Sequence, residues 1–348
     1  QIYCANSQTN AVNFTGNGTS YYWTNNNPNI GLTEFGEGNI GVFTTENSGL
    51  NPEIATITVE PIFSGGNSSC PGVNTTFTIT VNPTPEVDEF NSQALCSGEN
   101  TTEIDFTGVP SATEFEWTNS NELIGLNQTG IGDIQSFTSQ NPSDISNQFA
   151  EIIVTPSYSY AGLTCYGVSK SASITVHPIP SIDTLPNITH CNGSIVQEMN
   201  FPGTANLYSW TNSNTGTGMD ESGQQIISSF TATNTSVNTI QSIITVNPSY
   251  EEDENSCAGI PETFNLYVLP TPNVNPSNDQ ILCNGDLSDE ILFSGSISGA
   301  EYSWTNSLQS IGLLSNGIGN ILPFNVINNS NSQINAQIIV TPTFTENA

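Results

Sequence analysis

The stretch Tyr21-Tyr22-Trp23-Thr24-Asn25 decides how this chain is interpreted, because the same pattern returns three more times. It recurs as Phe115-Glu116-Trp117-Thr118-Asn119, Tyr208-Ser209-Trp210-Thr211-Asn212 and Tyr302-Ser303-Trp304-Thr305-Asn306. These copies hold the only four tryptophans of the 348 residues, at spacings of 94, 93 and 94 residues. A fixed period predicts a tandem array of one domain type. We expect four modules, at residues 1–83, 84–178, 179–270 and 271–348, the last incomplete at its C-terminal end.

Each module also carries short runs in which apolar and polar residues alternate. The most regular run is Ala55-Thr56-Ile57-Thr58-Val59-Glu60-Pro61, with close matches beginning at Ala150, Ser242 and Ala336. Alternation with period two, rich in Val, Ile and Thr, predicts a half-buried strand, which we expect the proline to end. Seven or so such runs per module, without a helical pattern, indicate an all-β fold. We predict tandem Ig-like antiparallel β-sandwich modules with Trp23, Trp117, Trp210 and Trp304 in their cores.

Proline pairs mark the expected module boundaries. They read Pro83-Thr84-Pro85, Pro178-Ile179-Pro180 and Pro270-Thr271-Pro272. Two fixed φ angles within three residues make a short, stiff, extended joint. A last strand that runs straight through such a joint favours modules stacked end to end, and so we predict a rod.

The charge balance excludes two classes of partner. The chain has 32 acidic residues but a single basic one, Lys170, and a net charge of −31. Binding to nucleic-acid phosphates or to anionic lipid needs Lys or Arg. No apolar run approaches the roughly 20 residues of a membrane-spanning helix, which predicts no direct membrane insertion. A chain with almost no site for trypsin-like proteases suits an exposed, extracellular location.

The seven cysteines recur in register with the tryptophans. Cys4, Cys96, Cys191 and Cys283 precede their tryptophans by 19, 21, 19 and 21 residues, and Cys70, Cys165 and Cys257 follow the first three by 66, 69 and 66 residues. This frame predicts one disulfide in each module: Cys4–Cys70, Cys96–Cys165 and Cys191–Cys257. Cys283 is then left over, with its partner expected beyond Ala348. Metal ligation is the rival interpretation, but the chain has no C-x-x-C pair and only two histidines.

No catalytic site and no cofactor are expected. His177, His190 and Lys170 have no counterparts in the other modules, and the Gly-x-Gly segments are predicted to be tight turns. Carboxylates near the joints are the one candidate for a metal site, because calcium takes six to eight oxygen ligands. The candidate calcium ligands are Asp88, Glu89, Asp183 and Asp279. The alternative is that these side chains are simply solvated.

The combined order of motifs resembles a known repeat. Cys, Trp-Thr-Asn, Ile-Gly-Leu, Gly-x-Gly-x-Ile, Ile-x-Val-x-Pro, Cys and Ile-x-Val-x-Pro-x-Pro follow one another as in the PKD-like repeats of very large Bacteroidota surface proteins. The order is similar in particular to that of the gliding-motility adhesins exported by the type IX secretion system. The resemblance implies an Ig-like stalk of a filamentous adhesin attached to the outer membrane. The third module departs from it at Gly216-Thr217-Gly218-Met219 and Gly223-Gln224-Gln225, and so its loops on that face are expected to differ.

These observations lead to one functional hypothesis and two alternatives. The hypothesis is a non-enzymatic, extracellular structural stalk of a cell-surface adhesin or filament, serving gliding motility or attachment. Its partners would be further copies of the module, with surface glycans or other cell-surface proteins as candidates. The first alternative is a repeated glycan- or protein-binding array. The second is an accessory region of a secreted enzyme.

Overall fold

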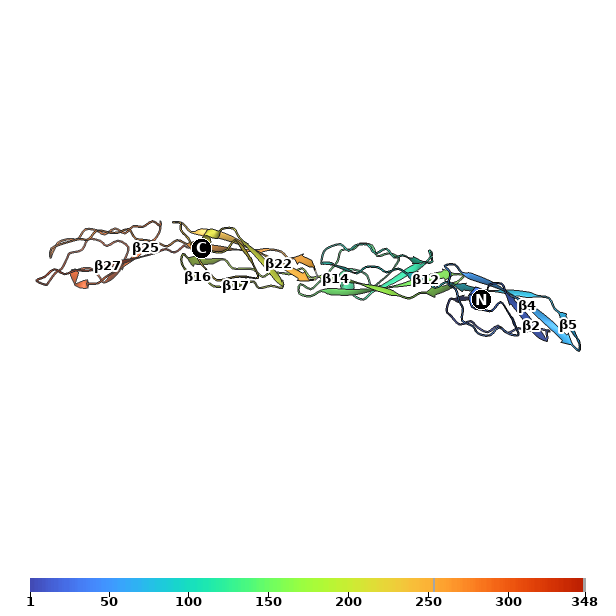
Figure 1. Cartoon of the computed structure of the whole chain (residues 1–348). Coiled ribbons are helices and arrows are strands. Elements are labelled where there is room, and N and C mark those ends of the chain that lie inside the picture. Colours follow the sequence, from blue (N-terminus) through green and yellow to red (C-terminus); the bar gives the residue numbers. More distant parts are fainter. Residues whose placement is uncertain (253, 347–348) are drawn as a thin grey trace. The chain divides into compact units, whose positions relative to one another are not determined.

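The computed structural model describes residues 1–252 and 254–346 (Figure 1). It divides into two compact units, Gln1–Ile179 and Pro180–Ala348, which are treated separately below. Each unit holds two of the expected modules, whose boundaries stay predictions. Within the described residues, helix is limited to four short 3-10 turns. Among those residues, none of the helices has the length and apolar character needed to span a membrane.

The first unit contains the strands of two modules. The elements of the first module are β1 (Ile2–Cys4), β2 (Ser20–Asn25), η1 (Pro28–Ile30), β3 (Phe35–Glu37), β4 (Glu53–Gly65), β5 (Ser68–Pro71) and β6 (Thr75–Asn82). Those of the second are β7 (Glu86–Val87), β8 (Gln93–Cys96), β9 (Gly108–Val109), β10 (Glu114–Asn119), η2 (Glu122–Ile124), β11 (Thr129–Ile131), β12 (Gln148–Tyr160), β13 (Leu163–Tyr166) and β14 (Lys170–His177).

The second unit repeats these elements. The third module has β15 (Ile188–Cys191), β16 (Ile195–Val196), β17 (Met199–Asn200), β18 (Leu207–Asn212), η3 (Thr215–Thr217), β19 (Ser222–Gln224), β20 (Ile226–Ile227), β21 (Phe230–Thr231), β22 (Ile240–Glu252), β23 (Asn255–Ala258) and β24 (Glu262–Leu269). The fourth has β25 (Glu301–Asn306), η4 (Gln309–Ile311), β26 (Asn316–Ile318) and β27 (Ile338–Thr343).

One sheet order recurs along the chain and confirms the predicted all-β, Ig-like fold class. The order β1-β6-β4-β2-β3 returns as β8-β14-β12-β10-β11 and as β15-β24-β22-β18-β19, and the fourth module keeps β27-β25-β26. One detail differs from a purely antiparallel sandwich. The strand that ends at the leading cysteine of a module (Cys4, Cys96 or Cys191) pairs in parallel with the last strand of that module, as β1–β6, β8–β14 and β15–β24. This pairing places the leading cysteine beside the end of the module's last strand.

The second layer of each sandwich is thin, and the core lies between it and the main sheet. In the first module the second layer consists of the bridges Gln8–Thr44 and Val12–Ile40, and in the third it consists of the pairs β16–β21 and β17–β20. Every module has its own cluster of buried apolar side chains. The four tryptophans belong to these clusters and are 5–7% exposed.

The Gly-x-Gly segments were predicted to be tight turns, but each begins inside a short strand that pairs with the tryptophan strand. Gly36, opposite Trp23 in the register of β2 and β3, has so little room that a Cβ there would lie 2.2 Å from the indole ring. The equivalent glycines, Gly130, Gly223 and Gly317, are equally close to their tryptophans. Gly38, the second glycine of the motif, has a φ of +74°, and Gln225 takes this conformation in the third module with a φ of +64°.

The Ile-Gly-Leu segment forms the end of a 3-10 turn, and the third module forms the same turn. Gly31 closes η1 with a left-handed φ of 88°, and Gly218 closes η3 with a φ of 89°. The expectation that the loops of the third module differ is therefore wrong at this turn. Thr217 takes the place of Ile30, and Met219 takes that of Leu32, because the turn depends on the glycine and on apolar contact rather than on one side chain.

The long strands continue through the proline that was expected to end them. β4, β12 and β22 each run for 13 residues and include Pro61, Pro156 and Pro248. Pro61 lies where β4 changes its neighbour: Val59 is opposite Thr75 of β6, and Ile62 is opposite Pro71 of β5. A proline lacks the N–H that a ladder needs and is tolerated where the ladder is interrupted. The strand therefore reaches past its module's last strand and forms a hairpin with β5.

Candidate functional site: the junction between the first two modules

A disulfide between Cys4 and Cys165 joins the first module to the second. The Cα atoms of the two residues are 5.6 Å apart, within the usual range of about 4.4–6.8 Å. Cys4 ends β1, and Cys165 lies in β13, the returning strand of the β12–β13 hairpin. The hairpin of one module is thus bonded to the leading cysteine of the module before it.

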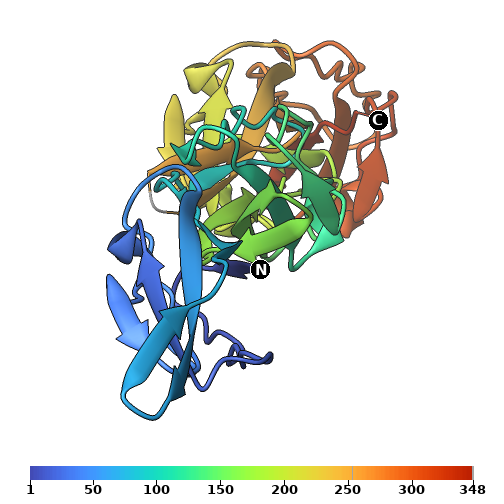
Figure 2. The same cartoon turned by 90° about the vertical axis from the view of Figure 1, so that its right-hand side faces the viewer.

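The predicted pairings Cys4–Cys70 and Cys96–Cys165 are therefore wrong, and sheet register explains why. Tyr3, next to Cys4, is in register with Val81, which is opposite Glu53 of β4. Cys70 is opposite Phe63, ten residues further along the same strand. Ten residues of strand span roughly 33 Å, whereas bridged Cα atoms lie within about 7 Å. In Figures 1 and 2 the β4–β5 hairpin accordingly lies at the end of the first module away from the amino terminus.

The third predicted pairing, Cys191–Cys257, fails for the same reason. The registers of β12 and β22 repeat that of β4, with Gln148 and Tyr158, or Ile240 and Tyr250, in the places of Glu53 and Phe63. Cys96 and Cys257 are both disulfide-bonded. Cys191 is an exposed free thiol, as are Cys70 and Cys283. An outside partner for Cys283 stays a prediction.

Asn82 adds polar contacts to the disulfide at this junction. Its side chain is fully buried at the end of β6, and its Nδ2 donates to the backbone oxygens of Tyr160 and Leu163 at 3.2 and 3.3 Å. Those two residues flank the turn of the β12–β13 hairpin, where Ala161 and Gly162 both have positive φ, as a two-residue hairpin turn requires. The end of the first module therefore holds the tip of the second module's hairpin. Sequence reasoning assigned no role to this asparagine.

The proline joint is part of the second module's core rather than a free linker. Pro83, Pro85 and Val87 are buried while the residues between them are exposed. The short strand β7 pairs with β9, and the Asp88 N–H donates to Thr107 O at 2.8 Å. Gly167 lies so close to the joint that a Cβ there would be 1.8 Å from Pro85 O. The extended segment after Pro85 is therefore an edge strand that completes the second sandwich.

The same arrangement recurs in the second unit. Asp183 N–H donates to Pro202 O at 2.9 Å, and a Cβ on Gly259 would lie 2.1 Å from Pro180 O. Ahead of the fourth module, Asn275 N–H donates to Ser294 O at 2.8 Å. The joint before the third module thus pairs with that module through the bridge Ile182–Gly203, and the joint before the fourth module makes a backbone hydrogen bond at the equivalent place.

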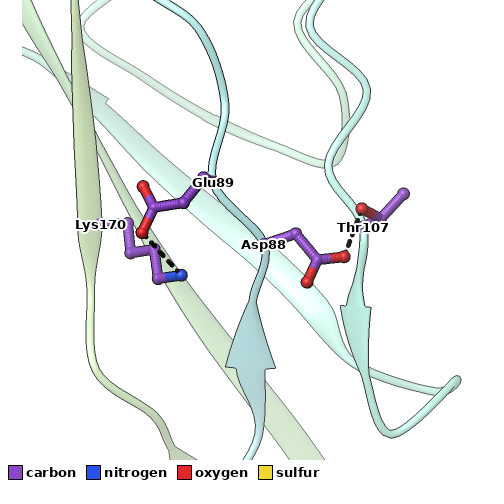
Figure 3. Close-up of polar contacts among 4 residues, drawn as sticks. All are labelled: Asp88, Glu89, Thr107 and Lys170. Carbon is purple, nitrogen blue, oxygen red and sulfur yellow. Dashed lines mark hydrogen bonds and ion pairs between the residues drawn. The ribbon is translucent and has the colours of Figure 1, made fainter.

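The candidate calcium ligands are dispersed or engaged with other partners (Figure 3). Asp88 Oδ2 accepts a hydrogen bond from Thr107 Oγ1 at 2.6 Å, and Glu89 Oε1 is 3.0 Å from Lys170 Nζ. Across residues 1–252 and 254–346, no three His, Cys, Asp or Glu side chains gather as a metal-binding group. Calcium binding by Asp88, Glu89, Asp183 and Asp279 stays a prediction without support from this geometry.

Asp183 instead influences a buried tyrosine. Tyr208 is 6% exposed and packs against Phe201, with ring centroids 5.6 Å apart. Burial raises the pKa of Tyr208 above the ordinary value of 10.0, and the negative charge of Asp183 raises this pKa further. The phenol is thus kept neutral, which is a structural rather than a catalytic arrangement.

The unique histidine and lysine of the second module also lie at its joints. His177 ends β14, as Asn82 ends β6, and is 2% exposed, with Nδ1 3.0 Å from Asn147 Oδ1. Lys170 begins β14 and contacts Glu89 of the preceding joint. Both side chains take part in structural contacts at the ends of the sheet.

Comparisons with known proteins return similar architectures only. No protein-family model matches this chain, and no curated protein matches it significantly. The extracellular domain of protocadherin gamma B4 aligns over 92% of this chain and 55% of its own, at 10% identity and a TM-score of 0.35. Mouse cadherin-23 repeats EC22–24 align over 75% and 90%, at 11% identity and a TM-score of 0.32. Sidekick-1 immunoglobulin domains 1–5 align over 99% and 75%, at 11% identity and a TM-score of 0.25. These structures are tandem arrays of cadherin or immunoglobulin domains.

Proposed function

We propose that this chain is a stretch of the non-enzymatic structural stalk of an extracellular adhesin or filament. The observation that carries the proposal is the Cys4–Cys165 disulfide, because a covalent bond between consecutive domains resists their separation under tension. The buried Asn82 contacts and the edge strand β7 strengthen the same junction. In this proposal the chain transmits force and carries out no chemical reaction.

The setting of the stalk is inferred from composition and from the family resemblance. Disulfides persist in oxidising, extracellular compartments, and a net charge of −31 with one basic residue suits a surface exposed to proteases. The resemblance to PKD-like repeats supports a Bacteroidota cell surface, export by type IX secretion, attachment to the outer membrane and a role in gliding motility or adhesion. Further modules of the same kind are the expected partners.

The alternative of a repeated binding array receives no specific support. Such an array calls for exposed aromatic side chains at matching places in successive modules. Phe35 is 72% exposed, but Thr129, Ser222 and Asn316 stand at its position in the other modules. Within the described part of the chain, this surface does not recur. Surface glycans and other cell-surface proteins stay candidate partners for surfaces other than this one.

The mechanical proposal predicts a difference in length between the oxidised and the reduced chain. When the termini are pulled, tension that reaches Cys4 crosses directly to Cys165 and bypasses the backbone between them. The sequence separation is 161 residues, which corresponds to roughly 55 nm of extended chain.

Single-molecule pulling of the full chain tests this prediction. The fully unfolded oxidised chain is expected to be at least about 55 nm shorter than the chain reduced with a phosphine. The reduced chain, in which the backbone is the only path, serves as the control. Equal contour lengths in both states would contradict a bridge that carries tension between modules, and with it the proposed role.

A further inference from the structure

The first module has an open apolar groove at the end that carries its hairpin. The groove has a volume of about 540 Å³. Its walls are formed by apolar side chains of both layers, with Cys70 at the rim; they include Val12, Phe14, Tyr21, Val59, Pro61 and Phe77. All of these residues belong to the first module, and so the groove is a property of one domain.

The second module fills the equivalent space with the joint that precedes it. Phe106, the counterpart of Phe14, packs edge to face against Phe90, with ring centroids 5.2 Å apart. Val87 is 2% exposed and belongs to the core cluster of the second module. In the third module, Ile182 and Leu185 of the preceding joint pack against the core in the same way.

Residues at equivalent positions are exposed in the hairpin of the first module, where the groove is open, and buried in that of the second, where a joint occupies the equivalent space. Phe63 of β4 is 58% exposed, whereas Tyr158 at the same register position of β12 is 8% exposed. Cys70 is an exposed free thiol, whereas Cys165 is 2% exposed and bonded to Cys4. The hairpin of the first module therefore leaves exposed the surfaces that are buried in the hairpin of the second module.

The backbone edge beside the groove is open in the same way. In the later modules an N–H of the joint donates to Thr107 O, Pro202 O or Ser294 O. The counterpart in the first module is Thr15, which lines the groove together with Gly16. This edge can accept an extended segment as one more strand.

We propose that this groove binds the joint of another module of the same kind, and that Cys70 forms a disulfide with the leading cysteine of that module. The occupant is an extended Pro-x-Pro segment followed by two apolar side chains, as in residues 83–90. In forming the bond, two thiols lose two protons and two electrons, which reduce a small-molecule disulfide such as oxidised glutathione. This interaction goes beyond the proposed function, because it concerns assembly between modules and holds whether or not the chain serves adhesion.

The first experiment places the chain's own joint in front of its first module. Gln1 precedes Cys4 by three residues, as Gln93 precedes Cys96, and so a copy of residues 83–92 fused ahead of Gln1 enters in register. Deuterium uptake at residues 10–25 of the full chain is expected to slow about tenfold, because a tethered segment has a high effective concentration. The matched control carries V87D and F90D in the copied segment and is expected to exchange as the unextended chain does.

Two outcomes would overturn this assignment. One is equal deuterium uptake in the chain with the native prefix and in the chain with the V87D/F90D prefix. The other is an unextended chain that dimerises through the groove in size-exclusion chromatography, with dimers lost on Phe63→Asp, since a second copy would then be the occupant.

The second experiment tests the disulfide with a longer prefix. A copy of residues 1–92 fused ahead of Gln1 supplies a whole module and joint, and the chain is oxidised with glutathione disulfide. Peptide mapping is expected to link Cys4 of the added copy to Cys70, which then resists alkylation. With C4S in the added copy, Cys70 should be alkylated as in the unextended chain. A free Cys70 beside an intact Cys4 of the added copy would overturn the proposed bond.

Discussion

Single residues explain why the repeated motif looks as it does. The asparagine of Trp-Thr-Asn is buried in every module, and in the first its Nδ2 donates to Leu32 O at 2.9 Å while its Oδ1 accepts from Asn27 N–H at 3.0 Å. Asn25 thereby fastens the end of β2 to the 3-10 turn. The burial of the tryptophans follows from alternation along the strand, but the task of this asparagine does not, because its partners are backbone groups that sequence patterns do not reveal.

Replacing Gly36 by alanine should destabilise the first module. The added Cβ would lie 2.2 Å from the Trp23 ring, and overpacking of this kind costs about 1–3 kcal/mol of unfolding free energy. Hydrogen exchange of peptides from residues 20–60 during urea unfolding measures the change. Gly41→Ala is the control, since nothing lies within 4 Å of a Cβ there. Equal effects of the two substitutions would contradict the packing argument.

Tyr208 should make the third module sensitive to high pH. Burial and the charge of Asp183 raise its pKa in the folded state above 10.0, so the stabilising effect is complete below about pH 10 and is lost as the pH rises above that value. Thermal unfolding of the third module, followed by deuterium uptake, should show a smaller loss of stability above pH 10 for Tyr208→Phe. Tyr21→Phe is the control in the first module. An unchanged profile of the third module in Tyr208→Phe would contradict the prediction.

The strands were the part of the structure that the sequence predicted best, and the length of one of them explains the main error, the disulfide pairing. Period-two runs rich in Val, Ile and Thr predicted the strands, and the sheet order confirms the fold class. The cysteine pairs were wrong because they were assigned from the repeat spacing, one pair to each module, and β4 was expected to end at Pro61. The strand instead continues to Gly65 and carries Cys70, opposite Phe63, away from the end of the module that holds Cys4. In the second module the sequence continues to alternate after Pro156, as Ser157-Tyr158-Ser159-Tyr160, and that signal would have placed its hairpin cysteine far from Cys96. The proline pattern marks the joints but does not show which of the two adjoining modules a joint packs against, because that depends on tertiary contacts.

Val87→Ala should weaken the second module and leave the first unchanged. Val87 is buried in the second module's core, and removing buried methyl groups there should cost about 2 kcal/mol of unfolding free energy. Deuterium uptake resolved by module measures the effect in the full chain. Thr84→Ala, at an exposed position of the same joint, is the control. If β7 were a passive linker, both variants would unfold like the parent chain.

At the level of the whole molecule, one disulfide joins consecutive modules. Cys4, the leading cysteine of the first module, bonds to Cys165 in the hairpin of the second module, and Cys96 and Cys257 are also disulfide-bonded. In the chain-entropy model, closing the 161-residue loop of the Cys4–Cys165 bridge stabilises the folded state by about 5 kcal/mol, because it lowers the entropy of the unfolded chain. The bridge does not decide whether the chain is a rod, which stays a prediction.

The offset of the Cys4–Cys165 bridge also sets an order of events during biogenesis. A chain delivered amino terminus first presents Cys4 well before the β12–β13 hairpin has emerged, and domains mature in that order. Cys4 therefore cannot bond to Cys165 until most of the second module has emerged. Formation of this disulfide would therefore lag behind emergence of the chain by about one module.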